Sequence, residues 1–277
     1  MTAEDCLREG DVEQALTQLQ DRVRKNPAAP KERTFLFQLL SVLGQWERAA
    51  SQLAVVGDLD ASAAPMVQTY RAALSCEAFR ASVFAGDKTP LLFGDPADWV
   101  ARMVQALRLA AEGRHADAGR LPEEALEQAP AVSGEIDGQA FAWIADADSR
   151  LGPVCEAIVN GKYFWIPFAR LQTIAIEPPE DLRDFVWMPA RLTFANGGES
   201  VALIPTRYLG SEAQADGALR LARKTEWMQA ADNTYLGSGQ RMLATDQAEY
   251  ALMDVRRIQL DSTSSAERQP DAGAGAG

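Results

Sequence analysis

The chain has 277 residues, of which 47% are hydrophobic and 24% are charged, enough for one large or two ordinary folded domains. Its net charge of −12, from 27 basic and 39 acidic residues, argues against nucleic acid and anionic lipid as partners. A single histidine, His115, excludes a metal site built on two histidines, and three widely spaced cysteines suit a reducing compartment. With neither a signal peptide nor a run of about 18 apolar residues, we expect a cytoplasmic protein.

Residues 1–132 carry apolar side chains at helical spacing, in stretches interrupted by glycine or proline. Three similar segments begin at Gly10, Gly44 and Gly113, separated by 34 and then by 69 residues. A 34-residue period in helical sequence is typical of tetratricopeptide (TPR) helix pairs, with the glycine in the turn between two helices. We therefore predict an all-helical domain of TPR-like pairs over 1–132, with an irregular helical bundle as the alternative.

Composition changes after residue 132, where proline, tryptophan and β-branched residues become denser. The expected elements are strands over 163–168 and 171–176, a hairpin over 186–204, a late strand within 250–260, and helices near 148–160 and 216–230. Asn196-Gly197 supplies the positive φ angles of a tight hairpin turn. The chain is thus predicted to be α+β, with a small antiparallel-sheet domain over 133–260 and a disordered tail over 261–277.

The run Asp146-Ala147-Asp148 is a carboxylate pair of the kind that can hold Mg²⁺. Together with Glu180 and Asp184 it raises the alternative of a Mg²⁺-dependent hydrolase. The competing interpretation is structural, with an aspartate capping a helix and Asp146 paired with Arg150. Because no nucleotide-binding or nucleophile motif occurs, we expect no catalytic residue, metal or cofactor.

A concave helical surface joined to a small sheet domain is typical of proteins that bind peptides or helices. The candidate partner-binding side chains are Phe37, Trp46, Phe79, Arg80, Trp143, Asp148 and Trp165. They divide between a groove in the helical half and an aromatic or edge-strand site in the sheet half. The sequence leaves both locations open.

Several long and unusual segments stand out. They are residues 26–40 with 44–49, 141–153, 161–168, 179–190, 204–208 and 237–241. Together they resemble the ImpE/TagJ family, accessory proteins of the bacterial type VI secretion system. The resemblance implies a non-enzymatic adaptor that binds the N-terminal segment of the small sheath subunit, TssB. It also implies a link to ClpV, the AAA+ ATPase that disassembles the contracted sheath, without nucleic-acid binding or membrane insertion.

Overall fold

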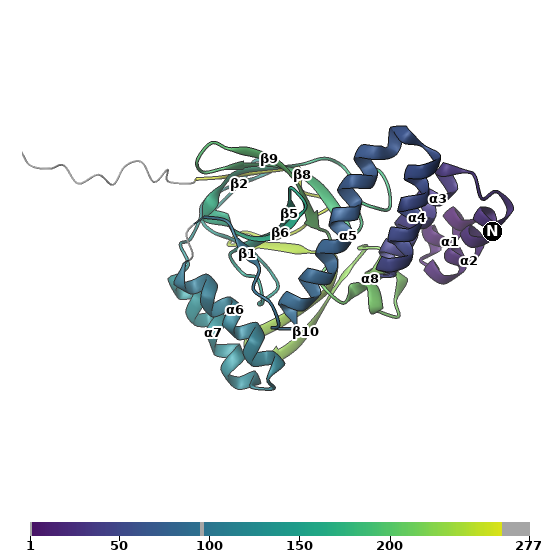
Figure 1. Ribbon diagram of the computed structural model, residues 1–277. Helices are drawn as coiled ribbons and strands as arrows, with labels where there is room; N and C mark the ends of the chain where they lie inside the picture. Colours follow the sequence, from purple (N-terminus) through teal and green to yellow (C-terminus); the bar gives the residue numbers. More distant parts are fainter. Residues whose placement is uncertain (1, 95–96, 262–277) are drawn as a thin grey trace, which may run out of the picture.

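The computed structural model describes residues 2–94 and 97–261. Helices dominate the first half of the chain and strands the second (Figure 1). The predicted α+β class, with helices first and a largely antiparallel sheet after them, is confirmed. The predicted tail falls outside the described residues except for Asp261, and so does the side chain of His115.

The helical half contains three helix pairs joined by tight turns and one longer helix. The helices are α1 (Ala3–Glu9), α2 (Val12–Lys25), α3 (Pro30–Val42), α4 (Trp46–Leu59), α5 (Ala64–Phe84), α6 (Asp98–Ala111) and α7 (His115–Gln128), with the short α8 (Gly217–Arg220) later in the chain. Gly10, Gly44 and Gly113 occupy the turns of the pairs α1–α2, α3–α4 and α6–α7, with φ of +84°, +65° and +76°. Glycine adopts this left-handed conformation without steric cost, which explains the repeated segments. Between the second and third pairs lies α5, so the third pair packs apart from the others (Figure 1).

The strands are short, and all but β1 follow α7. They are β1 (Leu91–Leu92), β2 (Gly134–Ile136), β3 (Gln139–Phe141), β4 (Ile144–Asp146), β5 (Val154–Val159), β6 (Lys162–Pro167), β7 (Leu171–Ile176), β8 (Trp187–Phe194), β9 (Glu199–Pro205), β10 (Thr225–Ala231), β11 (Thr234–Gly239), β12 (Met242–Thr245), β13 (Glu249–Ala251) and β14 (Arg257–Leu260). Nine form the main sheet, in the order β1-β6-β5-β9-β8-β7-β14-β2-β3, and it curls round an apolar interior (Figure 1). Its β1–β6 pair is parallel and its other pairs are antiparallel. The hairpin β10–β11 and the sheet β13-β12-β4 are separate.

Two predicted helices are wrong. Residues 154–159 form β5 and not a helix, because all six side chains are buried and the alternation that marks a strand is lost. Near 216–230 only α8 is helical, and residues 225–231 form β10. The strands predicted at 163–168 and 171–176, and the hairpin over 186–204, are confirmed.

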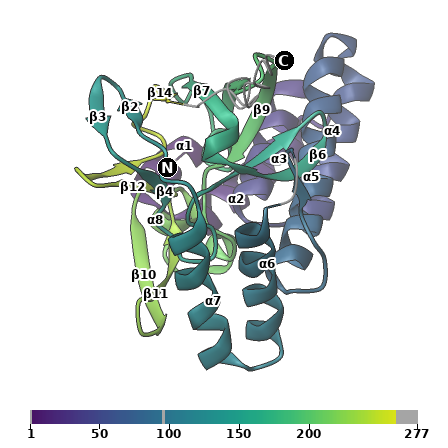
Figure 2. The same ribbon diagram turned by 90° about the vertical axis from the view of Figure 1, so that its left-hand side faces the viewer.

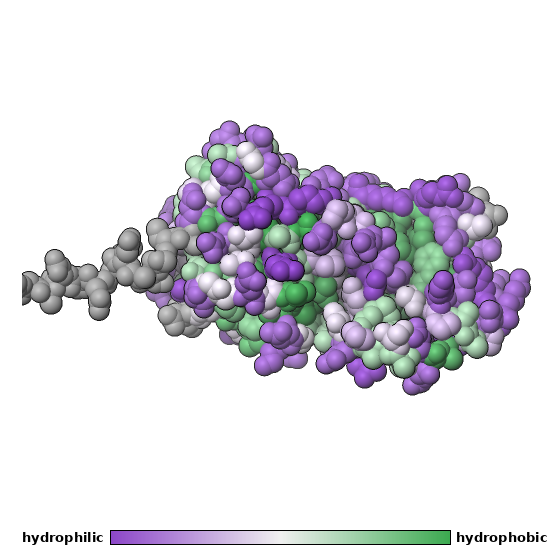
Figure 3. Space-filling view, turned by 90° about the horizontal axis from the view of Figure 1, so that it is seen from above, coloured by the Kyte–Doolittle hydropathy of each residue, from purple (hydrophilic) through white to green (hydrophobic). Residues whose placement is uncertain are grey.

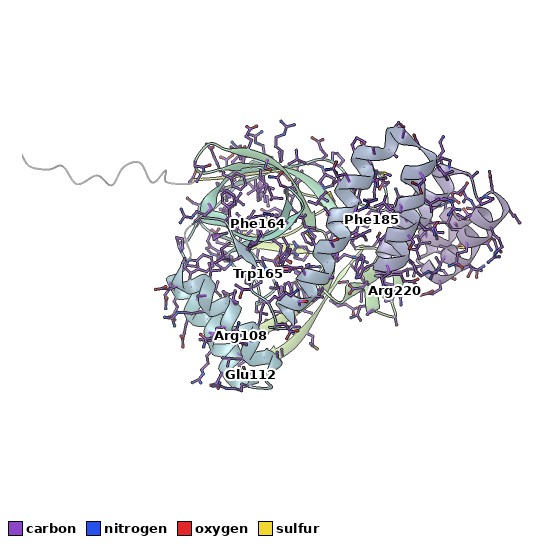
Figure 4. The ribbon with its side chains drawn as sticks, viewed as in Figure 1. Arg108, Glu112, Phe164, Trp165, Phe185 and Arg220 are labelled. Atoms are coloured by element: carbon purple, nitrogen blue, oxygen red, sulfur yellow. The ribbon has the colours of Figure 1, made fainter. Side chains whose placement is uncertain are left out.

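The helices share an apolar core with part of the sheet, and a second apolar cluster fills the interior of the curled sheet. The ring of Trp187 on β8 lies 5.8 Å from Tyr70 on α5 and 6.0 Å from Trp46 on α4. Polar contacts reinforce this junction, since the Arg207 guanidinium donates to the carbonyl of Val42 at the end of α3 (2.7 Å). Figure 4 shows Arg220 beside the N-terminal helices, where it forms a 2.7 Å ion pair with Glu13 of α2. The helices and the strands are therefore joined by both apolar and polar contacts.

Two further properties bear on function. Cys6, Cys76 and Cys155 are all free and buried. Within residues 2–94 and 97–261, no helix is long and apolar enough to cross a membrane.

Candidate functional site

A network of charged side chains lies inside the molecule, where α5, β4, β5 and β12 meet. Its members, which we call the ionic cluster, are Glu77, Arg80, Asp146, Asp148, Arg150, Glu156, Arg207 and Arg241. All are buried except Arg150, which is half-buried. The four carboxylates pair with Arg80, Arg150 and Arg241, and the Arg207 guanidinium donates to the carbonyls of Ser41, Val42 and Arg220, so the cluster holds four groups of each charge. Such balance is what permits charges to remain inside a protein.

Glu156 on β5 is the centre of the cluster. Its carboxylate accepts hydrogen bonds from Arg80 Nε and Nη2 at 2.7 and 3.1 Å, and also from Arg241 Nη2 and the Tyr163 hydroxyl. Burial alone raises the pKa of this carboxyl, but the two arginine charges outweigh burial and lower the pKa to about 2. The fold thus stabilises the charged form of Glu156.

Asp146, at the end of β4, lies in a different electrostatic environment from Glu156. It accepts hydrogen bonds from the Tyr208 hydroxyl (3.1 Å) and the Asp148 N–H (2.9 Å), and it forms an ion pair with Arg241. Burial raises the pKa of Asp146 to about 6, although the Arg241 charge acts in the opposite direction. The fold therefore disfavours the charged form of Asp146 relative to that of Glu156.

Asp148 and Ser149 fix the hairpin β10–β11. The carboxylate of Asp148 accepts hydrogen bonds from the N–H of Gly237 (2.8 Å) and from Arg150 Nε (2.8 Å). Ser149 exchanges two hydrogen bonds with Tyr235, since its hydroxyl accepts from the Tyr235 N–H (2.9 Å) and its own N–H donates to the Tyr235 carbonyl (3.0 Å). The unusual run 146–150 is thus a support for the hairpin.

Gly237 and Gly239 lie too close to neighbouring atoms to carry a side chain. A Cβ at Gly237 would lie 2.2 Å from ring carbons of Tyr208, and one at Gly239 would lie 2.1 Å from the carbonyl of Lys224. The segment 237–241 therefore requires glycine at both positions so that the hairpin can reach the cluster.

The geometry does not favour the hydrolase interpretation. Asp146 and Asp148 are buried in ion pairs, and Asp184 accepts from the N–H groups of Glu180 and Asp181 (2.7 and 3.1 Å) to stabilise a turn. In the described part of the chain, no three potential metal ligands gather. The ion pair predicted between Asp146 and Arg150 is wrong: Arg150 pairs with Asp148, because these residues form a loop and not a helical turn.

Four predicted partner-binding side chains lie in the interior. They are Phe37, Arg80, Asp148 and Trp165. Figure 4 shows Trp165 in the middle of the molecule, and its indole N–H donates to the Tyr163 hydroxyl at 2.7 Å. These side chains are not at a surface where a partner would touch them.

The other three predicted side chains reach the surface in different places. Trp46 is half-buried against Trp187, and Phe79 is half-buried 6.1 Å from the ring of Tyr163. Trp143 follows β3 and is 40% exposed. The structure therefore does not bring the seven predicted residues together at one site.

A groove absent from the sequence predictions lies between the pair α6–α7 and the hairpin β10–β11. It has a volume of about 390 Å³, and we call it the hairpin groove. On the upper face of the molecule, by contrast, hydrophobic residues form separate spots among hydrophilic ones (Figure 3). One signal for the hairpin was present in the sequence: Asp232-Asn233 marks a tight turn, and Asn233 has a φ of +55°.

The chain is similar to proteins of one known family. Residues 138–259 match the ImpE protein family. The sequence is 53% identical over 263 residues to the type VI secretion system accessory component TagJ of Pseudomonas aeruginosa, covering 95% of this chain and 92% of that protein. The fold matches a crystal structure of a Vibrio parahaemolyticus protein with a TM-score of 0.85 and 24% identity, over 93% of this chain and 97% of the other. The ImpE match includes Asp146, Glu156, Arg241 and the whole of the hairpin β10–β11.

Proposed function

The chain belongs to the ImpE/TagJ family, and we propose that it serves as a non-enzymatic adaptor of the type VI secretion system. In this proposal it acts in the cytoplasm and binds the N-terminal segment of TssB, the small sheath subunit. It thereby links the contractile sheath to ClpV, the ATPase that disassembles the sheath.

The structural observation that best supports a non-enzymatic role is that Asp146 and Asp148 are already paired with arginine side chains. A metal-dependent hydrolase needs carboxylates that are open to a metal ion and to substrate. Asp146 and Asp148 are 4% and 0% exposed, and each is held by an arginine. Asp148 holds the hairpin β10–β11 through the N–H of Gly237, and Asp146 is bound to Arg241 and Tyr208.

The charge of the chain favours a basic partner. A net charge of −12 attracts cationic segments and accelerates their encounter with the protein. An amphipathic helix would add affinity through apolar anchors at positions i, i+3, i+4 and i+7. We therefore infer that the bound TssB segment is helical, with basic flanks.

Co-purification of the full chain with sheath and ATPase tests the proposal. We expect retention of full-length TssB and loss of retention when its N-terminal segment is deleted. ClpV should join the complex when TssB is already bound. Equal retention of intact and truncated TssB would contradict the proposed recognition element.

The hydrolase alternative has a direct test. A specific metal site raises the melting temperature by mass action when the metal is present. We expect millimolar Mg²⁺ or Mn²⁺ to leave the melting temperature of the protein unchanged. A metal-dependent rise that disappears in Asp148→Asn would instead support the hydrolase.

A further inference from the structure

Strand β9 has one side without a partner over part of its length. It pairs with β8 in one continuous register, and just after β9 the N–H of Thr206 donates to the carbonyl of Val186 (2.9 Å). In an antiparallel pair, alternate residues direct their N–H and C=O groups toward and away from the partner strand. Even-numbered residues of β9 therefore bond to β8, whereas Glu199 and Val201 direct their backbone groups to the opposite side.

Strand β5 lies on that opposite side but ends too early to cover these groups. It pairs with β9 only through residues 158–159, and Asn160 and Gly161 then form the turn into β6, with φ of +50° and +73°. Within residues 2–94 and 97–261, the carbonyl of Val201 accepts from the hydroxyl of its neighbour Ser200 (3.2 Å), and no group accepts from its N–H. Such an open sheet edge is a template for an added strand.

Contacts with α5 fix the turn between β5 and β6. The Cys76 thiol donates to the carbonyl of Gly161 (3.4 Å), and a Cβ at Gly161 would lie 3.1 Å from that of Ala72. Figure 2 shows α5 and β6 side by side on the right of the molecule, with the hairpin β10–β11 on the left. Because the turn is packed against the helix, the edge of β9 stays open, away from the hairpin groove.

A second groove runs from this open edge across α5. It consists of two adjoining hollows of about 490 and 510 Å³, which share Gln68, Ala72 and Gly161. Each volume lies within the range of ligand sites in proteins, roughly 300–1,000 Å³. One hollow reaches Val201 on β9 and the other reaches Arg71 on α5. We call this surface the edge groove, and it shares no lining residue with the hairpin groove.

Val201 gives the edge groove an apolar anchor. Its side chain is 70% exposed, the highest value among the exposed large hydrophobic residues of the described chain. Alternate side chains of a strand share a face, so Val201 lies on the same face of the sheet as Leu203, which is buried in the core shared with the helices. A strand added beside β9 would cover Val201 and remove apolar surface from water.

Arg71 sets the sign of the charge in the edge groove. It is the one charged residue among the described residues that line the groove, and it is exposed. Beside the lining residues, along the chain and across the β8–β9 pair, two acids, Asp58 and Glu199, are balanced by two cations, Lys162 and Arg191. A carboxylate on a bound segment is the natural partner of the Arg71 guanidinium. A second copy of this chain, at a net charge of −12, is repelled as a whole.

We propose that the edge groove binds an extended acidic segment of another protein, which adds a strand to the main sheet beside β9. The backbone of this segment exchanges hydrogen bonds with Glu199 and Val201, an apolar side chain covers Val201, and a carboxylate pairs with Arg71. The site gives the proposed adaptor a second binding surface, and it does not depend on recognition of TssB.

Selection from a phage-displayed library of random decapeptides on the full chain tests this site. Phage that also bind Val201→Pro are removed first, because this variant lacks the outward N–H but keeps every hydrogen bond to β8. The most enriched peptide is then synthesised with a fluorescent label and titrated against each variant. Circular dichroism and melting temperature establish that each variant is folded.

The variants separate the backbone contribution from the charge contribution. Arg71→Glu reverses the charge in the groove, and Arg48→Glu makes the same change of charge at an exposed position on α4 outside the groove. Val201→Ile keeps both the N–H and an apolar side chain at the edge. Hydrogen exchange of the amides of residues 199 and 201 reports whether the bound peptide forms a strand there.

We expect enriched peptides with an acidic residue and alternating apolar residues. Arg71→Glu and Val201→Pro should each weaken binding at least about tenfold, with Val201→Ile and Arg48→Glu unchanged. Exchange of the two β9 amides should slow when the peptide is bound, because the added strand protects them.

Several results would overturn the inference. They include no enrichment, enrichment of basic peptides, and binding that Arg71→Glu leaves unchanged. A dimer that Val201→Pro dissociates, seen by analytical ultracentrifugation, would identify a second copy as the occupant. Tighter peptide binding after removal of residues 262–277 would identify the C-terminal segment of the chain itself as the occupant.

Discussion

Arg80 on α5 and Glu156 on β5 form a two-point ion pair, with Nε–Oε1 and Nη2–Oε2 distances of 2.7 and 3.1 Å. Both side chains are buried, at 4% and 0% exposure. The pair joins the helical half of the chain to the sheet in an environment where an unpaired charge is costly. Through this pair, the ionic cluster connects the helical half of the chain with the sheet half.

Loss of Arg80 should destabilise the protein strongly. In Arg80→Met, Glu156 and Glu77 lose a buried cation, and we expect the free energy of unfolding to fall by about 3–5 kcal/mol. Urea denaturation at pH 7 measures the change. Arg102→Met is the control, since Arg102 pairs with Glu124 at the surface and should contribute no more than about 1 kcal/mol. Equal losses in the two variants would refute a special role for the buried pair.

The two buried acids of the cluster should respond differently to neutralisation. Glu156→Gln removes a charge that the fold stabilises, whereas Asp146→Asn removes one that the fold disfavours. We therefore expect Glu156→Gln to cost about 3 kcal/mol at pH 7 and Asp146→Asn distinctly less. Urea denaturation of both variants tests the order, and a larger loss in Asp146→Asn would contradict it.

The contribution of Glu156 should depend on pH. Its pKa is about 2 in the folded protein and about 4.5 in the unfolded chain, so it stabilises the fold above pH 4.5. This contribution is lost as pH falls from 4.5 toward 2. The stability difference between wild type and Glu156→Gln should therefore be constant from pH 7 to 5 and shrink below pH 4.5. A gap that widens on acidification would be inconsistent with a lowered pKa.

Gly237 should not tolerate a side chain. An alanine Cβ there would lie 2.2 Å from the Tyr208 ring, which is buried and cannot move without disturbing the cluster. We expect Gly237→Ala to lower the free energy of unfolding by about 1–3 kcal/mol, measured by urea denaturation. Gly57→Ala, in helix α4 with only ordinary contacts, should be neutral or stabilising by up to about 1 kcal/mol. Similar effects at both positions would show that close approach at Gly237 is unimportant.

Asp148 should control the mobility of the hairpin. Asp148→Ala removes the acceptor for the Gly237 N–H and the partner of Arg150. We expect amide hydrogen exchange of residues 225–239 to accelerate more than that of β7 and β8, because those strands lie away from this contact. Unchanged exchange in the hairpin would mean that Asp148 is not its support.

The sequence predicted the elements that depend on local signals. The glycine turns at Gly44 and Gly113 and the hairpin over 186–204 each follow from local signals of a few adjacent residues, although in the hairpin turn Gly197 adopts a positive φ (+82°) and Asn196, contrary to the prediction, does not. Strand β5 lacked such a signal because it is buried along its whole length and does not alternate.

The sequence could not predict the ionic cluster, for a different reason. Its members lie between positions 77 and 241 and meet only through the fold. The sequence therefore presented Asp146 and Asp148 as a carboxylate pair and predicted neither the pair Asp146–Arg241 nor the pair Asp148–Arg150. The groove likewise combines two helices with a distant hairpin that was predicted to be helical.

The most direct measurement of the central proposal is a fluorescence titration of the wild-type chain with the N-terminal TssB peptide. A scrambled peptide of the same composition is the control for charge alone. The adaptor proposal predicts saturable binding at micromolar concentration or tighter, roughly −8 kcal/mol, with no binding of the scrambled peptide. No binding by the folded protein, or equal binding of both peptides, would contradict recognition of this segment.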